Sequence, residues 1–152
     1  MITEKVSPRY GRLMKFLGQE HGEISVGIHG PEGGAPHPAG TSVAEIAEQH
    51  EFGLGVPQRS FIRGWFDANQ REIERVLREQ LELSLKRGMS LDWALERVAL
   101  WAQADIQRFI VRGVPPPNHP ATIAKKGSST PLIDTGVLKA AVLAYYRGKR
   151  VA

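Results

Sequence analysis

Residues 67–112 read DANQREIERVLREQLELSLKRGMSLDWALERVALWAQADIQRFIVR, and this stretch decides the fold. Its apolar residues recur at steps of three and four, which places them on one face of an α-helix. Arg87-Gly88 is a suitable end for one helix, and Ser90 is a suitable N-cap for the next. We therefore predict helices from Asp67 to Lys86 and from Ser90 to Arg112. The short connection makes them antiparallel neighbours in a helical hairpin.

Two tryptophans lie beside the apolar stripe of the second predicted helix. Trp93 and Trp101 are eight residues apart and share roughly one face of that helix. Either they form the margin of the core, or they belong to a subunit interface, where tryptophan is enriched. The sequence leaves both interpretations open.

Two short stretches outside the hairpin have the period of β-strands. In Ile24–Ile28 apolar residues alternate with serine and glycine. In the second stretch, Val142–Tyr146, the residues Val142, Ala144 and Tyr146 alternate with Leu143 and Tyr145. We predict that the two strands pair, in an antiparallel sense because small sheets favour it. The expected fold is α+β: a small, mainly antiparallel sheet packed against the long helical hairpin and short helices. Residues 1–152 are expected to form one domain.

Short helices are predicted before the hairpin. Apolar residues at helical spacing indicate a helix from Tyr10 to Leu17 that ends at Gly18. Ser42 followed by Glu45 is the capping-box arrangement, and the helix that it begins should end near Phe52-Gly53.

The sequence RSFIRGWF at 59–66 has two possible structures, a strand or the approach to the long hairpin. Its aromatic residues are expected in the core. Arg59 and Arg63 are either solvated or bind the carboxylates of a partner. The aromatic residues concerned are Phe61, Trp65 and Phe66.

Two segments are too rich in proline and glycine to form a core. They are Pro31–Gly40 and Val114–Thr130, and the second contains the basic turn Lys125-Lys126. Long loops in a small domain are usually functional or disordered. We expect both segments to be loose in the monomer and to become ordered by neighbouring proteins.

Composition excludes several classes of function. The chain has no cysteine, so it forms no disulfide, thiolate metal site or cysteine nucleophile. Met1–Tyr10 lacks the apolar core of a signal peptide, and no apolar run approaches the length of a membrane helix, so we expect a soluble, cytosolic product with no membrane contact. The five histidines show no spacing typical of a catalytic or metal site. We therefore expect no enzymatic activity, no metal and no cofactor.

The residue types in the segment that follows the second loop indicate a turn. Pro131 fixes its own φ, and either Asp134 or Thr135 can serve as an N-cap. Gly136 then allows the chain to bend at little cost. An ordered turn followed by a C-terminal element is expected here.

The sequence KGSSTPLIDTGVL at 126–138 resembles the C-terminal signature of a tailed-phage family, the Mu-like virion morphogenesis or tail completion proteins. A second block is similar to the same family: AEIA at 44–47, EFG at 51–53 and PQRSFIR at 57–63. Both blocks occur in the expected order, with a helical middle between them.

This resemblance implies a structural virion protein that forms a ring, sixfold in symmetry, at the head–tail junction or the top of the tail. Its implied partners are further copies of itself, the head connector or stopper, and the tail-tube or tail-terminator proteins. Genome DNA can pass through such a ring. The protein would reside in the neck or tail of the virion and in the host cytoplasm during assembly. Tail completion, tail termination and head completion remain open as its role.

Candidate residues follow from the resemblance and from residue type. We expect Arg59 and Arg63 to meet carboxylates of an adjacent subunit, and the signature turn to hold the C-terminal strand. The candidate interface residues are Arg59, Phe61, Arg63, Trp93, Trp101, Lys125 and Lys126. The signature turn comprises Pro131, Leu132, Asp134, Thr135, Gly136 and Leu138.

Net charge supports one alternative function. The chain carries a formal charge of +4 and has a pI near 9.6, with small basic clusters at Lys125-Lys126 and Arg147–Arg150. These features are compatible with a prophage-encoded nucleic-acid-binding or regulatory module. No aromatic ladder is interleaved with the basic residues, as a single-strand binder would need.

Overall fold

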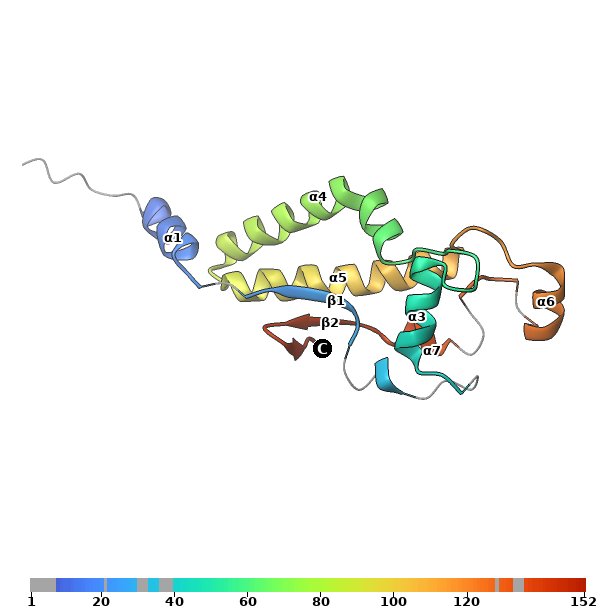
Figure 1. Ribbon diagram of the computed structural model, residues 1–152. Coiled ribbons are helices and arrows are strands. Elements are labelled where there is room, and N and C mark those ends of the chain that lie inside the picture. The colour runs from blue at the N-terminus through green and yellow to red at the C-terminus, as the bar shows by residue number, and fades with distance from the viewer. Residues whose placement is uncertain (1–7, 21, 30–32, 36–39, 128, 133–135) are drawn as a thin grey trace, which may run out of the picture.

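The computed structural model describes residues 8–20, 22–29, 33–35, 40–127, 129–132 and 136–152. Within them a long helical hairpin packs against a three-stranded antiparallel sheet, which confirms the α+β fold (Figure 1). The elements are α1 (Pro8–Leu17), β1 (Ile24–Ile28), α3 (Val43–Phe52), α4 (Arg63–Arg87), α5 (Leu91–Arg112), α6 (Pro120–Lys126), α7 (Val137–Ala140), β2 (Val142–Tyr146) and β3 (Lys149–Arg150).

The hairpin of α4 and α5 has the expected turn, although α4 begins at Arg63 rather than at Asp67. Gly88 ends α4 with a φ of 69°, a left-handed conformation that glycine adopts readily. The side chain of Ser90 accepts a hydrogen bond from the Trp93 N–H at 3.1 Å and so caps α5.

The predicted pairing of the two strands is confirmed. β1 and β2 are antiparallel, with Ile24 opposite Tyr146 and Ile28 opposite Val142. The sequence did not predict β3, which extends the sheet to the order β1-β2-β3. Arg147 and Gly148 connect β2 to β3, and both have a positive φ, as a type I′ hairpin turn requires.

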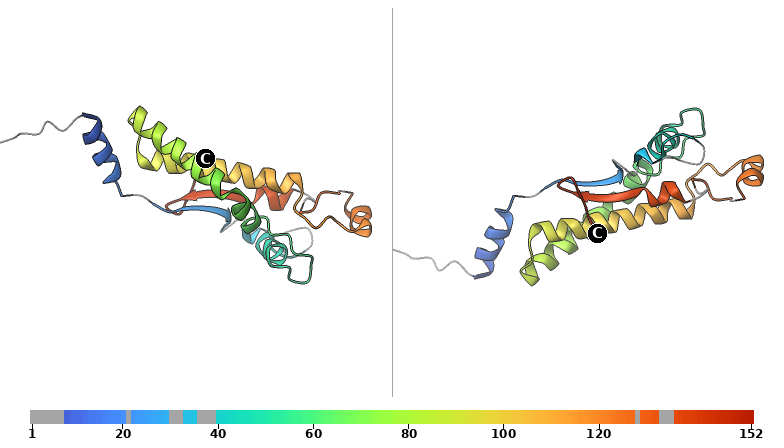
Figure 2. Two further views of the ribbon diagram at one scale, coloured as in Figure 1. Left: turned by 90° about the horizontal axis from the view of Figure 1, so that it is seen from above. Right: turned by 90° about the horizontal axis from the view of Figure 1, so that it is seen from below.

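Helix α5 forms the centre of the fold, because α4 and the sheet both pack on it (Figure 2). The side chain of Gln103 accepts a hydrogen bond from the Ala144 N–H at 2.7 Å, and that of Gln107 donates to the Val142 carbonyl at 3.0 Å. These two glutamines fix α5 to β2. The buried residues of α5 are Ala94, Val98, Ala99, Ala102, Ile106 and Ile110.

The aromatic residues at the start of α4 differ in burial. Phe61 is 0% and Trp65 4% exposed, as expected for core residues. The Trp65 indole also donates to the carboxylate of Asp105 at 2.7 Å, which joins α4 to α5. The prediction for Phe66 is wrong, since 51% of this residue is exposed. It follows Trp65 directly, and neighbouring residues on a helix point in different directions.

The second proline-rich segment is more ordered than expected. It includes the helix α6, whose N-cap His119 accepts a hydrogen bond from the Ala121 N–H at 3.3 Å. Val114 and Asn118 are buried, so part of this segment belongs to the core.

The first proline-rich segment, Pro31–Gly40, lies largely outside the described residues. Of its described part, Gly33 is buried, and Ala35 packs against the core and accepts a hydrogen bond from the Val43 N–H at 3.1 Å. The expectation that this loop contributes nothing to the core is therefore wrong at these positions. None of the helices in the described part of the chain combines the length and the hydropathy required to cross a membrane.

Truncation of Ile106 tests the central position of α5. Ile106 is 1% exposed, so Ile106→Ala should lower the free energy of unfolding by about 2–5 kcal/mol. Urea denaturation followed by circular dichroism measures this change. Arg71→Ala, at an exposed position on α4, is the matched control and should change stability by about 0.5 kcal/mol or less. Equal stabilities of the two variants would contradict this packing.

Candidate functional site

The carboxylate of Glu51, in the last turn of α3, is the polar centre of one end of the molecule. Glu51 is 7% exposed. Its oxygens accept hydrogen bonds from the backbone N–H groups of Phe61, Ile62 and Arg63 at 2.9, 3.0 and 3.0 Å. They also accept from the Ser60 hydroxyl at 2.6 Å and from Arg63 Nε at 3.0 Å. The chain entering α4 is thus arranged around a single carboxylate.

Glu51 caps α4 from another helix. The N-cap residue of α4 is Ile62, which provides no side-chain acceptor for the first N–H groups of the helix. The Glu51 carboxylate accepts from these groups and places a negative charge at the positive end of the helix dipole. It therefore fixes the position of α3 relative to the start of α4.

The same hydrogen bonds keep Glu51 charged. Burial tends to raise the pKa of its carboxyl group. The hydrogen bonds from Ser60, Ile62 and Arg63 outweigh burial, so the pKa lies below the ordinary value for glutamate. The charged form therefore contributes to stability at neutral pH.

Arg63 does not have the role that the sequence suggested. Its carboxylate partner is Glu51 of the same chain, and its guanidinium also donates to the Glu51 carbonyl at 2.9 Å and lies over the ring of Phe52. The expectation that Arg63 meets a carboxylate of a neighbouring subunit is therefore corrected. Phe61 is also unsuited to an interface, because it is fully buried.

Arg59 is buried without a carboxylate partner among the described residues. Only 5% of it is exposed, and its guanidinium donates to the carbonyls of Pro116 and Pro117 at 2.8 and 3.3 Å. Burial lowers the pKa of Arg59, although an arginine remains protonated in proteins. The two carbonyls fix the proline segment, and no described carboxylate balances the positive charge of Arg59.

Arg59 lines a cleft of about 780 Å³. The walls come from α3, the segment before α4, the proline segment, α6 and the signature turn. The described polar residues in the lining are His50, Arg59, Asn118, His119 and Thr122, and none of the described lining residues is acidic. Most of the remaining lining is apolar: Ile46, Val56, Pro57, Pro116, Pro117, Leu132, Val137 and Leu138.

The signature turn forms one side of this cleft. Pro131, Leu132 and Leu138 are buried, and Leu132 has a φ of 62°, which is uncommon for leucine. The predicted caps Asp134 and Thr135 lie outside the described residues. The residue at the N-cap of α7 is instead Gly136, with a φ of 79°. The turn leads through α7 into β2.

The remaining candidates are dispersed. Trp101 packs against the core and lies 5.8 Å from the Trp65 ring, measured between centroids, so its position fits the core-margin interpretation. Trp93 is half-buried in the first turn of α5. Lys125 is exposed on α6, while the side chain of Lys126 lies outside the described residues. None of these four lines the described part of the cleft.

Sequence reasoning missed the role of Glu51, which it treated only as part of a family block. One signal was present: a glutamate near the C-terminal end of a helix is unfavourable and calls for a partner. It also missed Asn118, a buried polar residue in the lining of the cleft. No sequence signal marked this position. Among the described residues, no group of three or more histidine, cysteine or acidic side chains is placed to hold a metal ion.

Comparison with known proteins gives no assignment: no family model, no curated protein and no solved structure matches this chain.

Replacing Glu51 tests its capping role. Glu51→Gln leaves several buried donors poorly satisfied, so it should lower the free energy of unfolding at pH 7 by about 1–3 kcal/mol. Because folding lowers the pKa of Glu51, its charge stabilises the fold above about pH 4.3, the ordinary value for glutamate. The difference between wild type and variant should therefore shrink as the pH falls below this value.

Urea denaturation at several pH values measures this difference. Glu48→Gln, at an exposed position on the same helix, is the control and should leave stability almost unchanged. A Glu51→Gln penalty that stays constant down to pH 2 would show that the charge is not involved.

Proposed function

We propose that this chain is a structural virion protein of a tailed phage, a ring-forming subunit at the head–tail junction or the top of the tail. One observation carries the proposal. The two sequence blocks that resemble tail completion proteins flank the hairpin in sequence, yet both line the same cleft in the fold. A shared site is expected if both blocks serve one function.

The chemistry of the cleft favours binding over catalysis. Its described lining contains two histidines and a threonine, but no carboxylate that could complete an acid–base pair. A buried guanidinium surrounded by apolar walls suits a segment with a carboxylate flanked by apolar side chains. We therefore assign the cleft to a segment of an adjacent virion protein, with its carboxylate bound by Arg59.

The partners follow from this role. Copies of the chain form a ring through two unlike surfaces, as closure by rotation requires, with sixfold symmetry. The head connector or stopper lies on one side of the ring, and the tail-tube or tail-terminator protein on the other. Genome DNA passes through the centre.

The positions of the basic residues support assembly rather than nucleic-acid binding. Lys125 lies on α6 at one end of the molecule, whereas the β2–β3 turn that carries Arg147 lies toward the other end (Figure 1). The two basic clusters thus form no single surface along which a nucleic-acid backbone could run.

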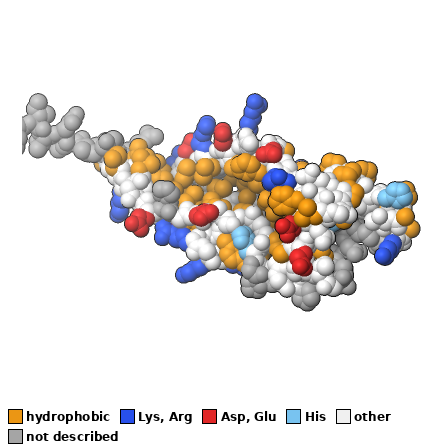
Figure 3. Space-filling view, viewed as in Figure 1, with side chains coloured by type: hydrophobic (Ala, Val, Ile, Leu, Met, Phe, Trp, Pro, Cys, Tyr) orange, Lys and Arg blue, Asp and Glu red, His pale blue; other side chains and the backbone are white. Residues whose placement is uncertain are grey.

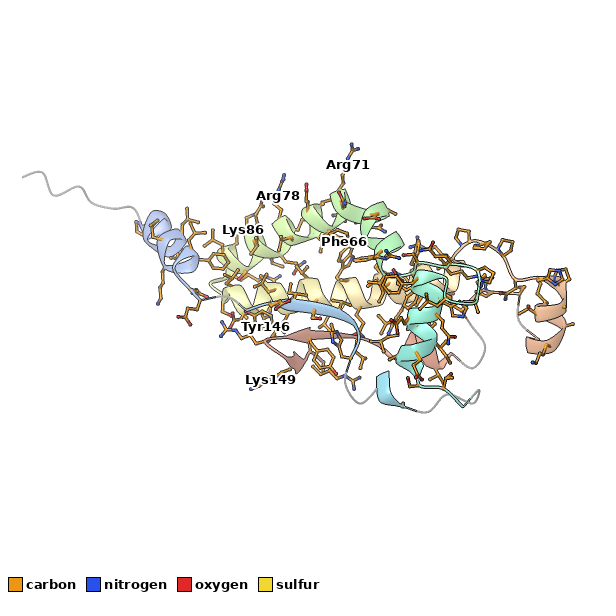
Figure 4. All side chains as sticks on the ribbon, viewed as in Figure 1. Phe66, Arg71, Arg78, Lys86, Tyr146 and Lys149 are labelled. Carbon is orange, nitrogen blue, oxygen red and sulfur yellow. The ribbon has the colours of Figure 1, made fainter. Side chains whose placement is uncertain are left out.

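Two substitutions in the cleft test the proposal. Arg59→Met keeps a long apolar stem but removes the charge, and Thr122→Glu adds a repelling charge at an exposed position of the lining. In a phage that lacks the wild-type gene, both variants should yield separate filled heads and tails, scored by electron microscopy and plaque counts. Arg78→Met, on the outer side of α4, should restore infectivity (Figure 4).

Thermal unfolding of each purified variant separates a lost contact from a lost fold. If folded Arg59→Met and Thr122→Glu proteins restore normal particles, the role of the cleft is refuted. Deletion of the whole gene tests the assembly role itself. Tails of abnormal length would then indicate termination rather than joining, and normal infectious particles would refute any role in assembly.

Duplex DNA binding tests the alternative. A nucleic-acid-binding module should bind DNA with an affinity that falls steeply as salt rises. We expect no binding by the purified protein in about 0.15 M salt, measured by fluorescence anisotropy. Micromolar or tighter binding with a steep salt dependence would favour the nucleic-acid role.

A further inference from the structure

Helix α1, which we call the arm, lies at one end of the molecule, outside the layers formed by the hairpin and the sheet, in all three views (Figures 1 and 2). It has ten residues, and isolated helices shorter than about 12–15 residues are marginal in water. Phe16 is buried, but Met14 and Leu17 are 50% and 63% exposed. The arm therefore presents apolar surface that its own fold does not cover.

The connection between α1 and β1 is held in place at several points. The Gly22 N–H donates to the Tyr146 hydroxyl at 2.8 Å, and the Arg147 guanidinium donates to the Glu20 carbonyl at 2.7 Å. The side chain of Gln19 accepts from the Leu91 N–H at 3.0 Å at the start of α5. A Cβ atom at Gly22 would lie 2.2 Å from Arg147 Cγ, so the close approach requires glycine. These contacts hold α1 at the end of the hairpin, where it touches α4 and buries Phe16, while Met14 and Leu17 remain exposed.

An apolar groove of about 520 Å³ lies between α4 and β1, with α5 as its floor. Val98, Ala102 and Ile106 of α5 line it, together with Ile24 and Val26 of β1. Hydrophobic side chains gather around a hollow in this part of the surface (Figure 3). β1 is also the edge strand of the sheet, so no further strand covers this side.

Phe66 lies in this groove. It is 51% exposed and points from α4 toward the groove, whereas Arg71 and Arg78 point to the opposite side of the helix (Figure 4). A large exposed aromatic side chain at an apolar groove is typical of a surface that a partner covers.

The charges of the arm and the groove are complementary. The sequence of α1 contains three basic residues and no acidic residue, and Arg12 and Lys15 are exposed. At the groove, Asp67 is part of the lining, and Glu23 directly precedes the lining residue Ile24. Neither carboxylate forms an ion pair with a described residue, while Arg63 of the lining is already paired with Glu51.

We propose that α1 of one copy of this chain docks in the α4–β1 groove of a second copy. Met14 and Leu17 would enter the apolar groove beside Phe66, and the basic side chains would face Asp67 and Glu23. Arm and groove are different surfaces, so each copy can bind one neighbour with its arm and another with its groove. Repeated around an axis, such a contact closes a ring. It is the subunit contact of the ring proposed above and in that sense rests on the proposed function.

Engineered cysteines test this contact directly, because the chain has none of its own. Met14→Cys and Phe66→Cys proteins, distinguished by a tag, are mixed and oxidised, and covalent heterodimers are measured on denaturing gels. We expect several-fold more heterodimer from this pair than from Met14→Cys with Arg71→Cys, which places the cysteine on the opposite side of α4.

Equal yields from the two pairs would overturn the proposal. A chain that carries both Met14→Cys and Phe66→Cys tests the alternative in which the arm occupies the groove of its own chain. An intrachain disulfide in the monomeric fraction would overturn docking between copies. Both cross-linking experiments use purified protein. A negative result would therefore refute the arm–groove contact without refuting the proposed function, which the phage complementation tests separately.

Self-association of folded variants gives an independent measurement. Leu17→Glu should raise the dissociation constant, measured by analytical ultracentrifugation, at least about tenfold. Leu54→Glu, at a comparably exposed leucine outside arm and groove, should leave it unchanged. Lys15→Glu should weaken association about two- to fivefold, and Asp67→Lys in the same chain should restore it. Equal effects of the two leucine variants, or no rescue by Asp67→Lys, would contradict the assigned groove.

Discussion

The contact between the Glu51 carboxylate and the start of α4 is the interaction on which the other features depend. It determines where the longest helix begins and where the short helix α3 lies. The position of α3 in turn defines one wall of the cleft, and the first turn of α4 defines one end of the apolar groove. A buried carboxylate with several N–H donors is a precise constraint, because each donor fixes one direction of approach.

The sequence predicted those elements whose signals are local and periodic. The hairpin follows from apolar spacing, and its turn from Gly88 and Ser90. The capping box at Ser42 and Glu45 was also correct, with hydrogen bonds in both directions. Strand pairing was predicted with less information, since alternation identifies a strand but not its partner.

The sequence could not predict contacts between residues far apart in the chain. Arg59 and Arg63 looked equivalent, four residues apart in a basic stretch. In the fold one is buried against proline carbonyls, and the other is half-exposed and paired with Glu51. Phe66 has the residue type of a core position but points into an open groove. The environments of these residues depend on the direction of α4 relative to α3, which the contact with Glu51 sets. No local sequence pattern encodes that direction.

The pairing of β1 with β2 determines the order in which the domain can fold. Ile24 pairs with Tyr146, so these two neighbouring strands are separated in sequence by most of the chain. The helical hairpin, whose contacts are close in sequence, can form early, whereas closing so long a loop is slow. During translation β1 must wait for residues 142–146 to leave the ribosome. Until then its apolar side chains remain exposed, and a newly made chain is most vulnerable to aggregation at this strand.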